Sequence, residues 1–289
     1  MCFKRYQRRE SNKKDATVKK IIKPANREQL VQIIRSEIEA QGWSADLNHI
    51  DVSGVKNLSL VFSNVFNLNE FNGDISKWDV SKVEDMDGMF YHSEFNGDIS
   101  KWDVSGVQSM NALFFQSKFN GEVSNWDVSQ VKDMGGMFQD SVFNQDLSRW
   151  NVGHVKSMAN MFRGGRFNGD ISQWNVSQVV SMGGMFANIA FNGDLSRWDI
   201  SKVRLMRGMF ENSGFDQALD DWNILAGSCI TTEMFKGSAL LNRLAQEEGL
   251  DVASLESDFE SVKRLWRKSI LNSTIGQADE KISVKRARL

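Results

Sequence analysis

The chain has 289 residues, of which 41% are hydrophobic and 25% are charged, and its formal net charge is −2. This composition is typical of a folded protein, and the length suits two ordinary domains or one elongated repeat array. The near-neutral charge excludes a chain-wide attraction to nucleic acid or membranes, and the sequence contains no run of 18 apolar residues that would predict a membrane span.

The chain begins with a basic segment. Residues 1–27 contain ten Lys or Arg residues against two acidic ones, which predicts a solvated, disordered arm over 1–25. The segment has neither the apolar core of a secretory signal nor a lipobox, so we expect a protein that starts in the cytoplasm. Nucleic acid or another anionic surface is the partner that such an arm would attract.

Residues 26–42 are predicted to form an N-terminal capping helix. Its apolar face consists of Leu30, Ile33, Ile34 and Ile38. Their spacing is that of an amphipathic helix. Asn26 is suited to cap the first turn, and Gly42 is suited to end the last one.

Residues 43–236 consist of repeated units. A Phe recurs every 24 residues, at Phe71, Phe95, Phe119, Phe143, Phe167, Phe191 and Phe215. A Trp follows each of them by seven residues, at Trp78, Trp102, Trp126, Trp150, Trp174, Trp198 and Trp222. A second Phe closes the units at Phe90, Phe114, Phe138, Phe162, Phe186 and Phe210, and it slips by one place to Phe235. A degenerate copy at 46–62, followed by four extra residues, precedes the others.

A unit of this length cannot bury its apolar residues alone, so neighbouring units must stack and share a core. The alternation from Trp78 to Val80 predicts a short strand. The spacing of Met86, Met89 and Phe90 predicts a short helix. The expected fold is an α/β repeat solenoid of about eight coils, each a short strand plus a short helix, with helical caps at both ends.

Two polar rows accompany the apolar ones. Asn recurs at Asn72, Asn96, Asn120, Asn144, Asn168 and Asn192. Stacked Asn side chains are expected to hydrogen-bond along the row and to satisfy a buried turn. An acidic row consists of Asp74, Asp98, Glu122, Asp146, Asp170 and Asp194. We interpret it as turn capping by backbone N–H groups, with calcium bridging as the alternative.

The position before each Trp is the candidate binding site. It is basic in four units, at Lys77, Lys101, Arg149 and Arg197. Repeat proteins bind through variable positions on one extended face, so this basic column is expected to contact an acidic protein, a glycan or nucleic acid. The alternative is a solvated face that prevents aggregation of coils.

Residues 237–273 are predicted to form a C-terminal helical cap, followed by a basic tail over 274–289. The segments 238–249 and 254–271 both have helical periodicity. Solenoids need caps with a polar outer face. A helix pair that binds a partner is the alternative interpretation.

A search for chemistry finds no catalytic pattern and predicts no cofactor and no metal site. We interpret His49, His92 and His154 as exposed repeat substitutions, because they form neither a column nor a ligand set. Cys229 is interpreted as a small core residue in a coil that breaks register, with a reactive thiol as the alternative. The glycines of MGGMF at 134–138 and 182–186 are expected to permit close packing of coils.

The unit FNGDISKWDVSKVEDMDGMF at 71–90 resembles the repeat of BspA-type leucine-rich-repeat surface proteins. It is similar in particular to the mycoplasma-lipoprotein repeat of unknown function, and the lead-in at 27–53 resembles the segment that precedes such arrays. The resemblance implies a leucine-rich-repeat-like solenoid, displayed on a bacterial surface or secreted, with a role in adhesion or host interaction. It carries over no catalytic residues.

These observations together predict a non-enzymatic binding scaffold for a protein or a glycan. The alternative is association with nucleic acid or an anionic surface through the basic terminal arms.

Overall fold

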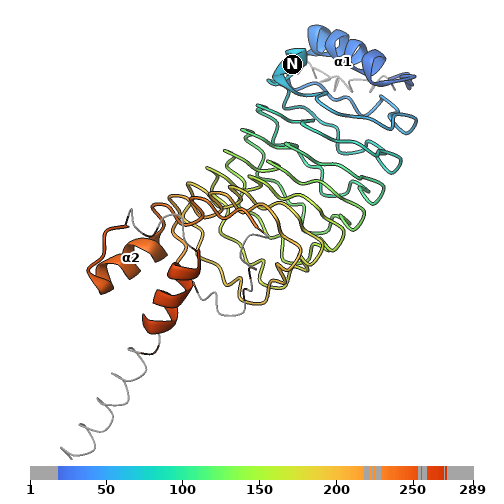
Figure 1. Ribbon diagram of the computed structural model, residues 1–289. Helices are drawn as coiled ribbons and strands as arrows, with labels where there is room; N and C mark the ends of the chain where they lie inside the picture. Colours follow the sequence, from blue (N-terminus) through green and yellow to red (C-terminus); the bar gives the residue numbers. More distant parts are fainter. Residues whose placement is uncertain are drawn as a thin grey trace, which may run out of the picture.

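The computed structural model describes residues 19–217, 222, 224, 229–252, 255, 259–269 and 271. These residues form an elongated stack of coils with helices at both ends (Figure 1). The described helices are α1 (Arg27–Gln41), the short 3-10 helix η1 (Asn64–Phe66) and α2 (Ala239–Glu248). Residues 259–269 are also helical. The basic segment over 1–18 and the tail over 274–289 lie outside the described residues.

Parallel bridges connect equivalent residues of successive coils. The bridged column consists of Asn57, Asp85, Ser109, Asp133, Ser157, Ser181, Leu205 and Ile230. The spacing is 24 residues from Asp85 to Leu205, which is the period of the repeat. It is 28 between Asn57 and Asp85, because the four extra residues of the first unit make room for η1. The degenerate copy at 46–62 therefore lies in register with the unit that follows it.

The short helix and the short strand expected within each coil are absent from residues 71–217. Alternate N–H groups donate to the next coil instead, as from Met86 to Ser109 O (3.0 Å) and from Gly88 to Asn111 O (2.8 Å). Between them, Met89 N–H donates to Met86 O (3.1 Å) and closes a turn. An α-helix needs every N–H for its own chain. The backbone here shares them between coils, so turns and single-residue bridges replace both elements.

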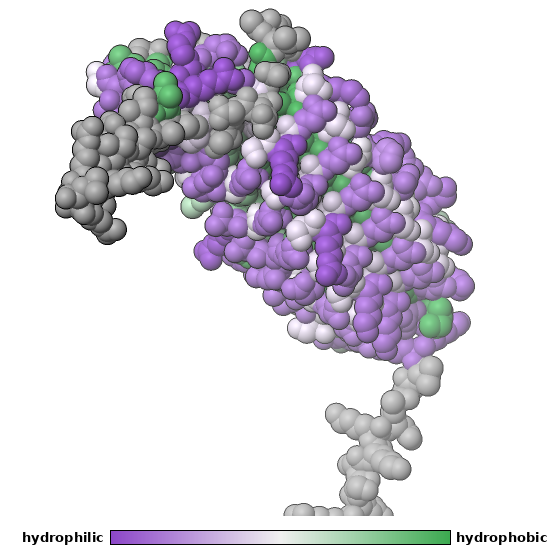
Figure 2. All heavy atoms as spheres, turned by 90° about the horizontal axis from the view of Figure 1, so that it is seen from below, coloured by the Kyte–Doolittle hydropathy of each residue, from purple (hydrophilic) through white to green (hydrophobic). Residues whose placement is uncertain are grey.

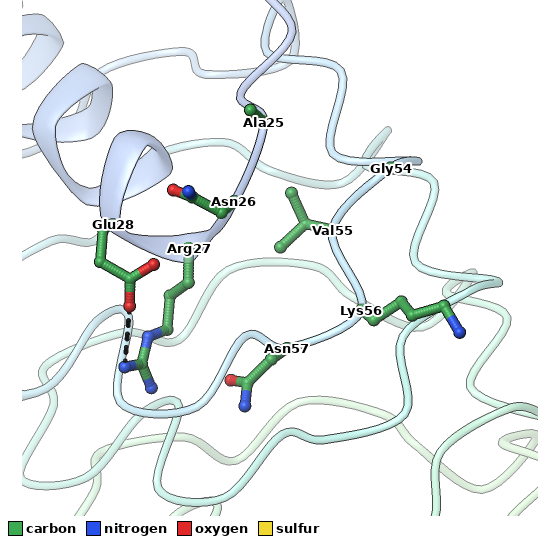
Figure 3. Close-up of a pocket in the computed structure, with 8 residues that line it drawn as sticks. All are labelled: Ala25, Asn26, Arg27, Glu28, Gly54, Val55, Lys56 and Asn57. Carbon is green, nitrogen blue, oxygen red and sulfur yellow. Dashed lines mark hydrogen bonds and ion pairs between the residues drawn. The ribbon is translucent and has the colours of Figure 1, made fainter.

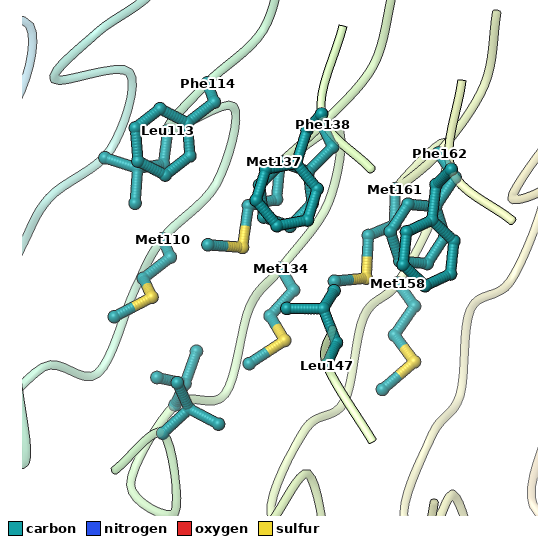
Figure 4. Close-up of a cluster of buried hydrophobic side chains, with 14 of the residues drawn as sticks. Met110, Leu113, Phe114, Met134, Met137, Phe138, Leu147, Met158, Met161 and Phe162 are labelled. Carbon is teal, nitrogen blue, oxygen red and sulfur yellow. The ribbon is translucent and has the colours of Figure 1, made fainter. Parts of the chain in front are cut away.

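The core is built from continuous rows of identical side chains. Figure 4 shows equivalent Met and Phe residues of successive coils lying side by side in rows. In the row of closing Phe residues, ring centroids are 5.5 Å apart for Phe90–Phe114 and 5.7 Å for Phe114–Phe138. The opening Phe residues form a second row beside it, with Phe119 stacked 4.2 Å from Phe114. Burial of this much apolar surface stabilises the stack only when coils are adjacent.

The Trp row adds hydrogen bonds between coils. The indole Nε1 of Trp102 donates to Ile75 O (3.2 Å), and that of Trp126 donates to Ile99 O (3.1 Å). Each acceptor is a backbone carbonyl of the preceding coil. A buried indole N–H needs such a partner, so each Trp of this row both fills the core and fixes the position of its neighbour.

The helix α1 covers the first coil, as Figure 1 shows. Asn26 Oδ1 accepts from Gln29 N–H (2.9 Å), and Gly42 N–H donates to Ile38 O (2.7 Å), which confirms both predicted caps. The buried face consists of Leu30, Val31, Ile34 and Ile38. Val31 thus takes the place that was expected for Ile33, which is only partly buried.

The predicted disordered arm over 1–25 is wrong for residues 19–25, because these residues lie along the first coil. Ile22 exchanges two backbone hydrogen bonds with this coil, to His49 O (3.0 Å) and from Asp51 N–H (2.8 Å). Lys23 pairs with Asp51 (2.7 Å) and, with hydrogen bonds from Ser53, lowers the pKa of that carboxyl to about 2. These contacts order the segment despite its charge.

At the far end, the helical segment 259–269 continues the core rows. Phe259 is buried and lies 6.2 Å from Phe235, as the last ring of the closing Phe row. The ammonium of Lys263 donates to Trp222 O. The helix α2 begins after Ser238, whose Oγ accepts from Leu241 N–H (3.2 Å), and ends at Gly249 in the left-handed region. The two helical segments predicted here are therefore present.

Candidate functional site

The predicted basic column is exposed and lies between two acidic rows. Lys77, Lys101, Arg149 and Arg197 are all exposed. The pKa of Asp98 is lowered by hydrogen bonds from Ser100 and, to a smaller degree, by Lys101. Asp103 lies two residues beyond the same Lys. The cations therefore partly neutralise the carboxylates of their own coils, and binding through this column stays a prediction.

The acidic row caps turns, as expected. Asp74 Oδ1 accepts from Ser76 N–H (2.9 Å) and Asp98 Oδ1 accepts from Ser100 N–H (2.9 Å). The same contact recurs at Asp146, Asp170 and Asp194. No group of three or more His, Cys, Asp or Glu residues within the described part of the chain is placed to hold a metal ion.

The Asn row differs from its prediction. The side-chain oxygen of Asn72 accepts from Asn96 N–H (2.9 Å), and that of Asn96 accepts from Asn120 N–H (2.8 Å). The row is exposed rather than buried. Each Asn side chain therefore accepts a hydrogen bond from a backbone N–H of the next coil on the surface. In an ordinary sheet, a backbone carbonyl of the neighbouring strand would be the acceptor.

A groove follows the bridged column along one face of the coils. It consists of two hollows of about 300 Å³ and 350 Å³ that share Ala159 and Asn160. We call the first the aromatic hollow and the second the charged hollow. The groove runs from Tyr91 to Glu233, and at about 4.8 Å per coil this is a length of roughly 30 Å.

The aromatic hollow is lined by uncharged residues. They are Tyr91, Asn111, Ala112, Phe115, Gly135, Gly136, Gln139, Ser157, Ala159 and Asn160. The rings of Tyr91 and Phe115 stack at 4.8 Å with an angle of 12° between their planes. His92 packs at 4.6 Å from Tyr91. All three are half-buried, so their rings pack together and remain partly exposed to solvent. We call these three residues the aromatic wall.

The charged hollow combines ion pairs with an apolar edge. Arg207 Nη2 lies 3.0 Å from Glu233 Oε2, and hydrogen bonds from Arg207 and Lys236 lower the pKa of Glu233. Leu205 lines this hollow at 43% exposure, and Ile230, its bridge partner, is 52% exposed. The bridged column thus changes from polar residues to apolar ones toward the C-terminal end.

The groove exists because one column carries small side chains in three successive coils. Two residues beyond the bridged column, the chain carries Asp87, Asn111, Gly135, Ala159, Gly183 and Arg207 in successive coils. The adjacent glycines Gly136 and Gly184 have φ values of +60° and +64°, a conformation that glycine adopts at no steric cost. The glycines of MGGMF therefore hollow the face, and they also permit close packing of coils, as expected. A Cβ at Gly184 would clash with Asn160 Oδ1 of the preceding coil, and one at Gly135 would lie 2.8 Å from Asn111 Nδ2.

The histidine interpretation is correct only for His154, which is exposed. His49 is buried at 9% exposure, because residues 19–25 and α1 cover the place that Lys77 occupies in the next coil. Its Nε2 lies 3.3 Å from Glu37 Oε1. His92 belongs to the aromatic wall. Aligning the repeats shows neither that residues 19–25 and α1 cover His49 nor that His92 contacts the rings of Tyr91 and Phe115.

Cys229 is half-buried against the core, as predicted for a small core residue. Burial raises the pKa of its thiol. A thiol with a raised pKa is less reactive, so the structure disfavours the reactive-thiol alternative. Cys2 lies outside the described residues.

A third hollow, of about 340 Å³, lies where α1 meets the first coil, between residues 25–28 and 54–57 (Figure 3). Arg27 pairs there with Glu28 (3.1 Å), and its guanidinium also donates to Ser59 Oγ (2.5 Å). These contacts join the helix to the stack. We interpret this hollow as part of the joint between α1 and the coils.

Three overlapping segments of the chain, 28–142, 92–186 and 141–247, match the family described as Mycoplasma protein of unknown function, DUF285. The chain belongs to this DUF285 family. The matches extend from α1 to α2, so the DUF285 region includes both flanking helices as well as the repeats. The chain matches no curated protein and no solved structure.

The surface of this DUF285 chain is mainly polar on the face seen in Figure 2, where apolar residues lie scattered between hydrophilic ones. Among the described helices, none has the length and hydrophobicity needed to cross a lipid bilayer. The groove is the candidate binding site of this surface.

Proposed function

We propose that this chain is a non-enzymatic binding scaffold that contacts a protein or a glycan through the groove. The observation that carries the proposal is the continuity of the two hollows across successive coils, with Ala159 and Asn160 in both. An extended groove with aromatic, amide and paired charged groups offers an elongated ligand many contacts, and repeat proteins bind through such faces. The groove groups bind and orient; they do not combine a nucleophile with a base.

We also propose that the coils form a leucine-rich-repeat-like solenoid of the BspA type. The bridged column from Asn57 to Ile230 supports this class, because it stacks one short segment per coil in parallel. A setting at a bacterial surface or outside the cell, with a role in adhesion or host interaction, belongs to the same proposal. The resemblance of the repeat is its basis.

The groove is a better candidate than the basic column. Lys77, Lys101, Arg149 and Arg197 alternate with carboxylates on an open surface, where exposed ion pairs contribute little to affinity. The groove instead has a hollowed floor and partly buried side chains, which lose less conformational entropy on binding.

The test compares two variants of the full chain on arrays of immobilised glycans and of extracellular proteins. Ala159→Arg fills the segment that the hollows share, and the fold accepts it because Arg207 stands at the equivalent place two coils later. We expect this variant to lose the wild-type ligand. The fourfold Lys/Arg→Ser variant of the basic column is expected to keep it.

The opposite result, with binding lost only in the column variant, would assign the site to the basic column. Retention on heparin or DNA that disappears when residues 1–18 are deleted would favour the basic arm instead. Melting curves of each variant show that the fold is intact.

A further inference from the structure

We propose that the aromatic hollow is a subsite for one neutral sugar ring of a longer glycan. This inference rests on the proposed binding function and names the ligand class. Its starting point is the wall of Tyr91 and Phe115. Tyr91 stacks on the Phe115 ring at 4.8 Å, and both rings line the hollow together with Gln139, the equivalent residue of the next coil. Aromatic faces pack well against the C–H groups of a pyranose, which carry a small positive charge.

The polar groups of the hollow suit hydroxyls. Asn111, Gln139 and Asn160 supply amides, and Ser157 supplies a hydroxyl. An amide donates and accepts at once, as a sugar hydroxyl does. The present hydrogen bonds of two of these amides are long, at 3.4 Å from Asn111 Nδ2 to Asp133 and 3.3 Å from Gln139 Nε2 to Asp140. They are therefore available for shorter bonds to a ligand.

The carboxylates around the hollow disfavour an anionic ligand. The nearest ionisable groups include Asp87, Asp133 and Asp140, which interact with the amides or backbone of the lining residues. The hollow itself contains no cation. The cation Arg163 lines only the adjoining charged hollow. A sulfated, phosphorylated or sialylated sugar in the aromatic hollow would therefore meet carboxylates first, whereas a neutral ring meets only dipoles.

The backbone of this face favours a glycan over a peptide strand. The N–H groups of Gly88, Ala112, Gly136 and Asn160 all donate to the next coil, at 2.7 to 2.8 Å. A peptide that adds to a sheet edge needs free main-chain donors. These four donors are used and cannot pair with an added strand, so recognition here depends mainly on side chains, and side chains of this kind match a sugar.

The size of the hollow sets the unit that it holds. About 300 Å³ is at the low end for ligand sites, which fits one ring with its hydroxyls. The rest of the chain of sugars would continue past Ala159 and Asn160 into the charged hollow.

The experiment measures binding of the full chain to immobilised cellohexaose, maltohexaose, chitohexaose and mannohexaose, with sulfated and sialylated oligosaccharides of similar length as comparison. We expect at least one neutral hexasaccharide to bind, and the acidic ones to bind at least tenfold more weakly. Phe115→Ala is expected to weaken binding at least tenfold, and the matched Phe115→Tyr to leave it within about threefold, because it keeps the ring.

A second variant keeps the aromatic wall and fills the space. Gly135→Gln places a side chain where Asn111 stands one coil earlier, and the nearest atom to the new Cβ is the movable Asn111 Nδ2. This variant should also lose the sugar by at least tenfold. The inference is overturned if no neutral hexasaccharide binds at millimolar concentration, if acidic ones bind better, or if Phe115→Ala and Gly135→Gln bind like wild type. A protein ligand that Ala159→Arg abolishes, with no glycan bound, would leave the scaffold function standing and refute the sugar subsite alone.

Discussion

At the residue scale, the repeated tetrapeptide Trp-Asp-Val-Ser divides its tasks between core and surface. In the second full unit, Trp102 donates to the preceding coil, and Val104 is buried beside it. Asp103 Oδ1 accepts from both the N–H (3.1 Å) and the hydroxyl (2.6 Å) of Ser105. Each polar atom thus has a local or neighbouring partner, which explains why these residue types recur together.

Asp87 differs from the Asp residues that cap turns, because its pKa is raised and theirs are lowered. It accepts hydrogen bonds from Ser109 Oγ (2.5 Å) and Asn111 N–H (2.8 Å), yet desolvation raises its pKa. Since the folded-state pKa lies above the unfolded one, ionisation costs stability. This cost appears as the pH rises through the unfolded pKa, and it is complete above the folded pKa. We expect Asp87→Asn to raise the melting temperature by about 1–3 °C at pH 7 and to lose that advantage at pH 3.

Asp98→Asn is the matched control with the opposite sign. Hydrogen bonds from the side chain and backbone of Ser100 lower the pKa of Asp98, so its contribution is present above the unfolded pKa and is lost as the pH falls through the folded one. This variant should melt below wild type at pH 7 and approach it at low pH. If thermal melts showed the same pH dependence for both variants, the opposite pKa shifts of Asp87 and Asp98 would be contradicted.

At the element scale, the two ends of the stack are closed in different ways. The helix α1 lies across the first coil and buries an apolar face on it. The segment 259–269 instead extends the core rows, since the Phe259 ring stacks on Phe235 and Lys263 bonds to Trp222 O. Partner binding by this helix pair stays a prediction, and the buried face of the pair is already occupied by the coils.

We therefore expect Phe259→Ala to destabilise the C-terminal end by about 3 kcal/mol, the usual cost of deleting a buried aromatic ring. Hydrogen exchange should accelerate in residues 229–252 and remain slow in residues 71–142, because coils interact only with their neighbours. Arg264→Ala, an exposed change on the same helical segment, serves as the control. Equal acceleration along the whole chain would refute a local closing role.

At the scale of the whole molecule, stability comes from contacts between adjacent coils. The hydrogen bonds, ring stacks and bridges described above join residues 24 positions apart or nearly so. An array of this kind has no unique central unit. One unit is therefore removable, provided that the rows on either side of the cut remain in register.

Deletion of residues 143–166 tests this property, because it joins Val142 to Phe167 and keeps every row. We expect a folded protein with a sharp thermal transition and a melting temperature only a few degrees lower, since one interface is lost. Deletion of residues 143–154 removes half a unit and should abolish the transition. Circular dichroism and thermal melts distinguish the outcomes; an unfolded 24-residue deletion would show that the units are not equivalent.

The groove could not be predicted from the sequence. The sequence shows a conspicuous basic column, but its members lie among carboxylates: Lys77, Lys101, Arg149 and Arg197. The groove depends on missing side chains at Gly135, Ala159 and Gly183 and on rings contributed by separate coils. The one sequence signal for the groove was the variation in side-chain size within the column from Asp87 to Arg207.

The sequence by itself determined the period, the anchor residues of the core and the helices near both ends. These depend on residue types that recur at fixed spacing, and spacing is fully visible in one dimension. Only the tertiary structure decided the path of the backbone within a coil and the position of the groove. Both depend on which N–H groups donate to a neighbouring coil and on how unlike residues of different coils lie side by side, and neither is a property of one unit alone.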